Sequence, residues 1–487
     1  MGNDPTPPNP QWNKEVATSM SPTPLPHPAA FTDELWHTLR EWHAPSPASH
    51  PWQSLTLYTP GPTLRIALNR ILLAGLEDLA HNDAQAAQLL RLRFGDEMTA
   101  QVAANRLNVV EGTIYKWQRA AVDQLSECLW RLESEARARQ QSRLTSHLPP
   151  ATYTHLFGVE SHIEALRDRL FMPEAPWLVA LESLGGVGKT ALADALCRRL
   201  IGENRVTGLA WITAQQQQMA LGGHIQKMER PALNSAELIQ SLAHQLLADE
   251  ADYATLSLAR KKERLTQRFR SSPHLVVVDN LETLADVDAL LDHLRAWANP
   301  TKFLLTTRYS LLAEADIYHF PLPELTQTDA LALVRHEARL RNLAGVADAS
   351  ESELNPIYGS VGGNPLALRL VVGQLHVYPL PTVLGNLQRA QGSAATGLYT
   401  HIYQQAWQTL DEEARRILLA MPLVNPDGGD IDLLAAITDL PADSLRDGLE
   451  QLVTRNLVDA RGDMHQRRYS IHSLTRTFLH EQVLHWE

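Results

Sequence analysis

One segment constrains the fold more than any other: an apolar run, a glycine-rich turn and a helix-like pattern, in the residues LVALESLGGVGKTALADAL. The turn holds Gly185, Gly186 and Gly188, and Lys189 and Thr190 follow it directly. Glycines allow successive backbone N–H groups to turn toward a phosphate, and the start of the helix adds the positive end of its dipole. This order predicts a phosphate-binding loop between a strand and a helix, formed by Gly185, Gly186, Val187, Gly188, Lys189, Thr190 and Ala191.

The two residues after the last glycine carry the chemistry of such a loop. Lys189 reaches the phosphates, and the hydroxyl of Thr190 is a ligand for Mg²⁺. One position departs from the pattern GxxxxGK[ST], because Ser183 stands where the first glycine is expected. A serine fits there if its backbone is helical or extended.

Four apolar runs alternate with helix-like segments between residues 156 and 322: WLVALES, VTGLAWITA, HLVVVDN and KFLLTTR. Continuous apolar runs are typical of parallel strands that are buried on both faces. We therefore expect a multidomain α/β plus all-α protein, in which residues 156–322 form a parallel sheet with helices on both faces. Helices follow from residue 323, and short apolar stretches near the end of the chain indicate a small hairpin attached to helices.

Two of these runs end in polar residues at the sheet edge where ligands bind. Asp279 ends the run HLVVVD and is predicted to hold Mg²⁺ through water. Glu282, or less favourably Asn280, would position the attacking water. Neither is an acidic residue directly after Asp279, so we expect slow hydrolysis. Arg308 ends the next run and would contact the γ-phosphate.

Taken together, these motifs resemble the NB-ARC (AP-ATPase) family of STAND P-loop NTPases. The resemblance covers about residues 156–483 and implies ATP, ADP and Mg²⁺ as ligands. It also implies a nucleotide domain over 156–322, a helical domain over 323–398 and a winged-helix domain over 399–487. In the segment LFGVES, the resemblance implies that Phe157, Gly158 and Val159 line the adenine.

Two later motifs extend the resemblance. In GGNPLAL, Pro365 is similar to the proline with which the family packs on adenine. In YSIHSL, His472 matches the histidine that holds the β-phosphate of ADP in the closed state, but Ser473 replaces the usual aspartate. The replacement implies a looser ADP state. Read without the resemblance, Pro365 is a helix-starting proline and His472 a structural histidine.

The N-terminal part of the chain has a different character. Residues 1–60 are rich in proline and contain one short amphipathic helix, FTDELWHTLREW, whose aromatic face we expect to dock on the next part of the chain. Residues 61–140 read as an all-helical domain, and residues 141–155 read as a polar linker. Both cysteines, Cys128 and Cys197, are expected to be buried packing residues.

Within the helical part, residues 86–125 resemble the helix-turn-helix of region four of bacterial sigma factors. The second helix, from about Glu111, would present Thr113, Tyr115, Lys116 and Arg119 to the DNA major groove. Acidic neighbours limit the number of phosphates that this helix can neutralise. The alternative is that the motif only packs against protein.

Composition argues against several other classes of protein. The formal net charge is −12, which argues against a protein that coats nucleic acid along its whole surface. No run approaches the length of about 20 apolar residues that a membrane-spanning helix needs. The N-terminus lacks the pattern of a secretion signal, so we expect a cytoplasmic protein without a membrane partner.

Three hypotheses follow. The first is an ATP/ADP-dependent switch with slow ATPase activity that self-associates on nucleotide exchange and acts through its helix-turn-helix. The second is a DNA-binding transcription regulator with a structural nucleotide. The third is the ATPase subunit of a bacterial defence or conflict system, whose sensor or effector is a separate protein.

Overall fold

The computed structural model describes residues 29–213, 217–219, 225–227, 234–281, 287–375, 377–388, 403, 405–408, 410–425, 428–455, 457–462, 466–471, 475 and 479. The chain divides into two compact units, Met1–Arg143 and Leu144–Glu487. Among the described residues, no helix is both long and apolar enough to span a membrane.

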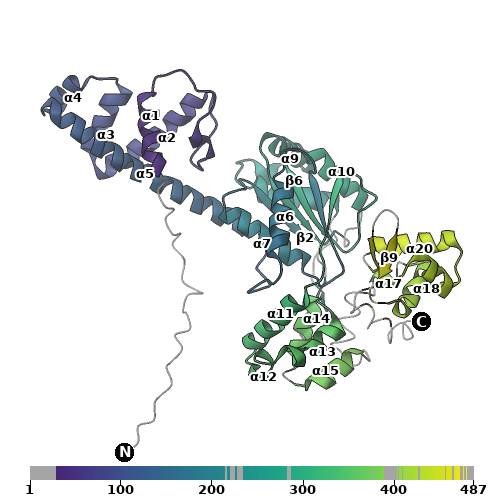
Figure 1. Ribbon diagram of the computed structural model, residues 1–487. Helices are drawn as coiled ribbons and strands as arrows, with labels where there is room; N and C mark the ends of the chain where they lie inside the picture. Colours follow the sequence, from purple (N-terminus) through teal and green to yellow (C-terminus); the bar gives the residue numbers. More distant parts are fainter. Residues whose placement is uncertain are drawn as a thin grey trace, which may run out of the picture. The chain divides into compact units, whose positions relative to one another are not determined.

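The first unit is helical. Its elements are α1 (Ala29–Arg40), η1 (Pro51–Ser54), α2 (Leu64–Asn82), α3 (Ala84–Leu90), the π-helical turn η2 (Arg91–Gly95), α4 (Ala100–Leu107) and α5 (Glu111–Ser146) (Figure 1). Phe31, Leu35 and Leu39 of α1 are buried in one core with α2 and α5. The expected docking of the amphipathic helix within the chain is therefore confirmed.

Two polar groups fix the loop between α1 and α2. Glu133 of α5 is fully buried and accepts hydrogen bonds from the backbone N–H groups of Thr56, at 2.9 Å, and Leu57, at 3.0 Å. His50 caps η1, because its Nδ1 accepts a hydrogen bond from the N–H of Trp52 at 3.1 Å. Burial lowers the pKa of His50, so the fold favours the neutral ring.

The helices expected around the turn at residues 107–109 are present. Thr99 caps α4 by accepting a hydrogen bond from the N–H of Val102. Asn108 ends the helix with a φ angle of 56°, the left-handed conformation that asparagine tolerates better than most residues. Helix α5 then begins at Glu111, as predicted.

The segment 141–155 is not the polar linker that its composition predicted. Helix α5 continues to Ser146, and Leu144 and Leu148 are buried in the core of the second unit. Further on, Arg198 donates a hydrogen bond to the carbonyl oxygen of Pro149 at 2.8 Å, and the Tyr153 hydroxyl donates to Asp194 at 2.7 Å. Apolar residues at helical spacing and specific side-chain bonds therefore hold this segment against the second unit.

The second unit is built around a five-stranded sheet in the order β2-β5-β6-β1-β7, and every neighbouring pair is parallel. The strands are β1 (Leu178–Glu182), β2 (Leu209–Thr213), β5 (Leu275–Asp279), β6 (Lys302–Thr307) and β7 (Ile317–Pro321). The four runs expected to be strands are β1, β2, β5 and β6. The fifth strand, β7, was not expected, because it lies at an edge and is only half-buried.

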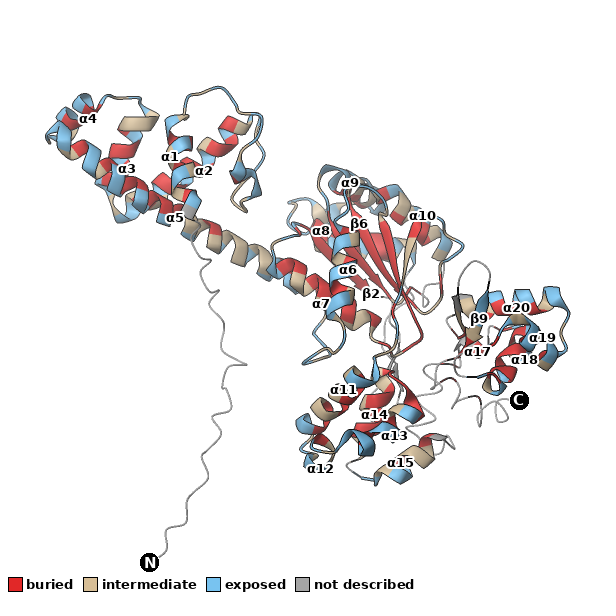
Figure 2. Cartoon of the chain, viewed as in Figure 1, coloured by how far each residue is buried: buried red, intermediate tan, exposed pale blue. Residues whose placement is uncertain are grey.

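Helices cover both faces of the sheet, which confirms the predicted fold class (Figure 1). One face packs on α6 (Glu160–Leu170) and α7 (Lys189–Gly202). The other packs on α8 (Ser235–Leu246), α9 (Leu258–Ser271) and α10 (Val287–Trp297). Figure 2 shows the strands buried between these layers, which explains their continuous apolar runs.

Helices follow the sheet along the chain. They are α11 (Gln327–Leu340), α12 (Ala344–Ala347), α13 (Glu351–Val361), α14 (Pro365–Gln374), α15 (Leu380–Gln388), α17 (Gln405–Gln408), α18 (Glu412–Ala420), α19 (Ile431–Thr438) and α20 (Ala442–Thr454). Strands β8 (Asp459–Gly462) and β9 (Arg467–Ser470) then form the antiparallel hairpin expected near the end of the chain. A short hairpin, β3 (Gln217–Met219) with β4 (Ile225–Lys227), follows β2.

Candidate functional site

The loop between β1 and α7 needs glycine at two positions. Gly186 and Gly188 have φ angles of 84° and 109°, which residues with a Cβ rarely adopt. A Cβ on Gly186 would also lie 2.8 Å from Oδ1 of Asn364. Gly188 directly precedes Lys189, the first residue of α7, so the loop delivers its backbone to the N-terminus of a 14-residue helix. This is the geometry in which backbone N–H groups receive a phosphate.

Ser183 replaces the first glycine of the pattern without strain. Ser183 is not among the described residues that have a positive φ angle. Its backbone therefore has a conformation that a residue with a Cβ tolerates. Its carbonyl oxygen accepts a hydrogen bond from Nζ of Lys189 at 2.7 Å, and the carbonyl oxygen of Leu184 accepts another at 3.1 Å. Lys189 is buried, with 8% of its surface exposed. The backbone carbonyl oxygens of the loop therefore bind the ammonium group of Lys189.

Asp279 is the centre of a hydrogen-bond network at the carboxyl end of β5. It is 1% exposed. Its Oδ1 accepts hydrogen bonds from the hydroxyls of Thr190 and Thr306, both at 2.7 Å. Its Oδ2 accepts from the hydroxyl of Thr213 at 3.2 Å and from Nδ2 of Asn280 at 2.9 Å. The structure thus brings together Thr190 and Asp279, the two residues predicted to hold Mg²⁺.

The donor set fits a magnesium ion. A threonine hydroxyl and an aspartate carboxylate are hard oxygen ligands, which Mg²⁺ prefers, and such sites keep several waters. Thr190 lies at the first turn of α7 and Asp279 at the end of β5, so each comes from a rigid element. Thr306, from the run KFLLTTR, and Thr213, which the sequence did not single out, orient the carboxylate.

Asn280 has a φ angle of 61° and is bonded on two sides. Its N–H donates to the hydroxyl of Thr306 at 2.9 Å, and its side-chain amide donates to Asp279. Asn280 is therefore a partner of the carboxylate, and its role as the weaker alternative for positioning water stays a prediction. Glu282, the favoured residue for that role, lies outside the described residues.

Arg308 lies over the phosphate-binding loop. It follows β6, and a Cβ built on Gly185 would be 3.3 Å from both Cζ and Nη1 of its guanidinium. The side chain is half-buried. The arginine predicted to contact the γ-phosphate is therefore next to the loop that would hold the phosphates.

Glu182 connects the loop to the segment after Arg308, and sequence reasoning missed it. This carboxylate is 4% exposed and directly precedes Ser183. Its Oε2 accepts from the Ser310 hydroxyl at 2.8 Å. Its Oε1 accepts from the N–H of Leu311 at 2.8 Å and pairs with Nδ1 of His319, in β7, at 2.9 Å. The sequence feature that could have identified Glu182 is its charge at the end of an otherwise apolar run.

The motif GGNPLAL contacts the phosphate-binding loop through its asparagine. Asn364 is fully buried, and its Nδ2 donates to the carbonyl oxygen of Gly185 at 3.0 Å. The same side chain caps α14 by accepting from the N–H groups of Leu366 and Ala367. The N–H of Leu366 also donates to the carbonyl oxygen of Gly186 at 3.2 Å.

Pro365 itself occupies the first turn of α14 and is half-buried. Its expected contact with adenine stays a prediction. The residue that the sequence reasoning passed over was Asn364, although a capping asparagine before a helix-starting proline is a recognisable signal.

The segment predicted to line the adenine lies against α11. Gly158 has a φ angle of 65°, and a Cβ there would lie 2.7 Å from Oδ2 of Asp329. The ring of Phe157 is 5.6 Å from that of His336, between centroids. Val159 is half-buried and precedes α6. The role of these residues in binding adenine stays a prediction, and His472 and Ser473 lie outside the described residues.

In the first unit, the residues predicted to face DNA lie on the first turns of α5. Tyr115 is 58% exposed, and Lys116 and Arg119 are exposed as well. Thr113 is half-buried.

Comparison with known proteins decides the family of the central region. Residues 159–342 match the model of the NB-ARC domain family. This part of the chain is an NB-ARC domain. The matched range contains the phosphate-binding loop, Asp279 and Arg308 but ends before Asn364 and Pro365.

The chain is also similar to curated plant proteins. Disease resistance-like protein DSC1 of Arabidopsis thaliana is 26% identical over 231 residues, which are 47% of this chain and 18% of that protein. Disease resistance protein RPP8 of the same plant is 23% identical over 202 residues, which are 41% of this chain and 20% of that protein. The chain thus spans about one fifth of the length of these two relatives.

Among solved structures, the chain is similar to a Signal Transduction ATPase with Numerous Domains (STAND) protein with a tetratricopeptide repeat sensor from Pyrococcus horikoshii. The identity is 15% and the TM-score 0.32, over 69% of this chain and 43% of that one.

Proposed function

We propose that this chain is an ATP/ADP-dependent molecular switch with slow ATPase activity. In the ADP form the chain is closed, and exchange for ATP opens it and leads to self-association. The output passes through the helix-turn-helix of the first unit. The NB-ARC match over residues 159–342 supports nucleotide binding, and the residue arrangement around the loop supports its use as a switch.

The observation that carries the proposal is the bond between the phosphate-binding loop and α14. Asn364 and Leu366 donate to the carbonyl oxygens of Gly185 and Gly186, so α14 is attached to the loop itself. A nucleotide that enters the loop changes the position of these carbonyl groups. A ligand shifts a conformational equilibrium when its affinity differs between the two states. Attachment of α14 to the loop gives the phosphates a direct way to make that difference.

The residues of the site divide the chemistry among them. Lys189 exchanges its carbonyl partners in the loop for phosphate oxygens, and Thr190 with Asp279 would hold Mg²⁺, which neutralises phosphate charge when bound. Arg308, whose guanidinium lies next to Gly185, contacts the γ-phosphate and so distinguishes ATP from ADP. Phe157, Gly158, Val159 and Pro365 line the adenine, and His472 holds the β-phosphate of ADP. Glu282 positions the attacking water, without an acidic residue directly after Asp279, so turnover is slow.

The test is the nucleotide content of the protein. The chain is purified without added nucleotide and denatured, and the released nucleotide is identified by chromatography. We expect near-stoichiometric ADP from the wild type and none from Lys189→Ala. Lys262→Ala, which removes a cation on α9 of the same domain, is the matched control and retains ADP. Equal ADP in wild type and Lys189→Ala would refute the assigned pocket.

Self-association is tested on the same samples by light scattering after exchange of ADP for a non-hydrolysable ATP analogue with Mg²⁺. A larger mass in the ATP state alone supports the switch. An empty wild type that hydrolyses ATP steadily as a monomer contradicts it and favours an ATPase subunit whose sensor or effector is a separate protein.

A second candidate function is sequence-specific DNA binding. It is favoured by the α4–α5 turn and by the exposed side chains of Tyr115, Lys116 and Arg119. A gel shift with genomic fragments, at two salt concentrations and in both nucleotide states, tests it. A shift that weakens with salt and disappears in Lys116→Ala/Arg119→Ala supports it. If the gel shows no shift in either nucleotide state, DNA binding is refuted as a function.

A further inference from the structure

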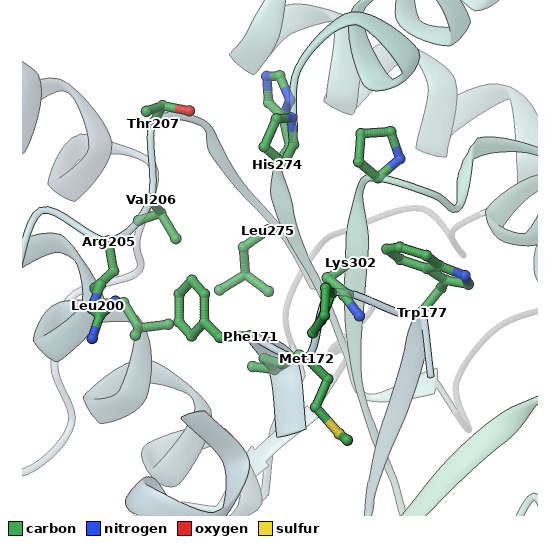
Figure 3. Close-up of a pocket in the computed structure, with 14 residues that line it drawn as sticks. Phe171, Met172, Trp177, Leu200, Arg205, Val206, Thr207, His274, Leu275 and Lys302 are labelled. Carbon is green, nitrogen blue, oxygen red and sulfur yellow. The ribbon is translucent and has the colours of Figure 1, made fainter. Parts of the chain in front are cut away.

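A cavity lies at the end of the sheet opposite the phosphate-binding loop. Its walls come from the segment after α6, the residue before β1, the segment after α7 and the starts of β5 and β6 (Figure 3). Because the five strands of this sheet are parallel, their amino ends are at one edge and the nucleotide site is at the other. The cavity has a volume of about 320 Å³, in the range of small-molecule sites.

The lining combines apolar surface with positive charge. Phe171, Met172, Trp177 and three prolines supply much of the apolar wall. The charged side chains among the described lining residues are Lys302 and Arg205, and none of these residues is an aspartate or glutamate. The chain as a whole carries a net charge of −12. An apolar cavity whose charged lining residues are all positive is therefore unusual for this chain.

Lys302 is buried, and within the part of the chain that the structure describes it has no carboxylate partner. It is 8% exposed, and its ammonium donates to the carbonyl oxygens of Glu174, at 2.8 Å, and Pro176, at 2.9 Å. The same nitrogen lies 4.0 Å from the centre of the Trp177 ring. Burial lowers the pKa of this lysine, because the charged ammonium loses its contact with water. A bound anion would restore the missing charge balance.

The aromatic side chains define the rest of the ligand. Figure 3 shows Trp177 beside Lys302 on one side of the cavity and Phe171 with Arg205 and Leu200 on the other. Phe171 and Met172 are each 42% exposed, so the rim presents apolar surface to water. Aromatic and proline walls suit a flat apolar body, and a buried ammonium suits a carboxylate.

We propose that this cavity binds a small aromatic carboxylic acid. The aromatic ring lies among Phe171, Met172 and Trp177, and the carboxylate faces the ammonium of Lys302. This site is separate from the nucleotide site and does not depend on the proposed switch.

The probe is phenylacetate, and the reporter is the ε-methyl group of Met172 in the full chain labelled at its methionine methyls. The resonance is assigned by its loss in Met172→Leu. We expect a saturable shift with a dissociation constant of about 1 mM, which is typical for a ligand of about ten heavy atoms. Neutral phenylacetamide should bind about tenfold more weakly, because it lacks the charge-assisted contact. Absence of a saturable shift, or equal affinity for acid and amide, overturns the proposal.

Two variants assign the contacts. Lys302→Met replaces the charged side chain by an uncharged, unbranched one and should remove the preference for acid over amide, whereas Lys262→Met, on α9, should keep it. If Lys302→Met fails to fold, Phe171→Ala at the exposed rim provides the second test. This variant should weaken binding of acid and amide together. Unchanged binding in Phe171→Ala places the ligand elsewhere and refutes the site.

Discussion

The bond between Asn364 and the phosphate-binding loop gives the sharpest prediction. Asn364→Ser keeps a hydroxyl that can cap α14 but removes the amide that donates to the carbonyl oxygen of Gly185. Asn364→Ala removes both the cap and the link. Asn355→Ser, on the exposed surface of α13, is the matched control. Comparing the three variants separates the two roles of one side chain.

The magnitude follows from the contacts that are lost. The bond to Gly185 is 3.0 Å long and buried. Its loss leaves a buried carbonyl oxygen unpaired, which costs about 1–3 kcal/mol. Asn364→Ser should therefore lower the free energy of unfolding by about 1–3 kcal/mol. Asn364→Ala should lose about 1 kcal/mol in addition, for the cap.

The consequence for nucleotide binding is what tests the switch. If the closed ADP form has α14 attached to the loop, loss of the link should weaken ADP binding by about tenfold or more and ATP binding by less. Urea unfolding measures the stability, and calorimetric titration with ADP and a non-hydrolysable ATP analogue measures the affinities. Equal weakening for both nucleotides would show that the link stabilises the fold but does not couple to the nucleotide. Unchanged stability in Asn364→Ser would refute the energetic argument itself.

Three further predictions concern buried polar groups. Glu182→Leu leaves its donors without an acceptor and should lower the free energy of unfolding by about 2–4 kcal/mol, measured as a lower urea midpoint; an unchanged midpoint would contradict this. Glu133→Ala strands the N–H groups of Thr56 and Leu57, and hydrogen exchange at these two amides should accelerate while exchange in β5 stays unchanged. The pKa of His50 is lowered in the fold, so the unfolded state binds more protons below the ordinary pKa of 6.5 and stability falls as pH falls through that window. His50→Asn, whose Oδ1 replaces Nδ1 as the cap, should reduce this pH slope in thermal unfolding, and an identical slope would assign it to other groups.

Several features of the site followed from local sequence rules. The order of strand, glycine turn and Lys189-Thr190 predicted the phosphate-binding loop, because only that order places backbone N–H groups at the start of a helix. Asp279 at the end of an apolar run predicted its meeting with Thr190, since the carboxyl ends of parallel strands share an edge. The turn before α5 and the amphipathic α1 were likewise readable from short-range pattern.

Other features depended on residues far apart in the chain. Glu182 pairs with groups more than 120 positions away, and Asn364 lies 179 positions from Gly185, so no local periodicity reports either bond. The edge strand β7 is half-buried and lacks the apolar run that marks a central strand. Residues 141–155 read as a linker because their polar composition hid Leu144 and Leu148, whose burial depends on the packed second unit.

The sequence by itself therefore determined the chemistry at the phosphate loop, because phosphate binding depends on the backbone of a few consecutive residues. Only the tertiary structure decided what touches that loop. The carbonyl groups of Gly185 and Gly186 are bonded to α14, and Arg308 and Glu182 join the loop to the segment after β6. These contacts form between distant segments when the sheet and helices pack, and pairing across such distances is a property of the fold rather than of any one segment.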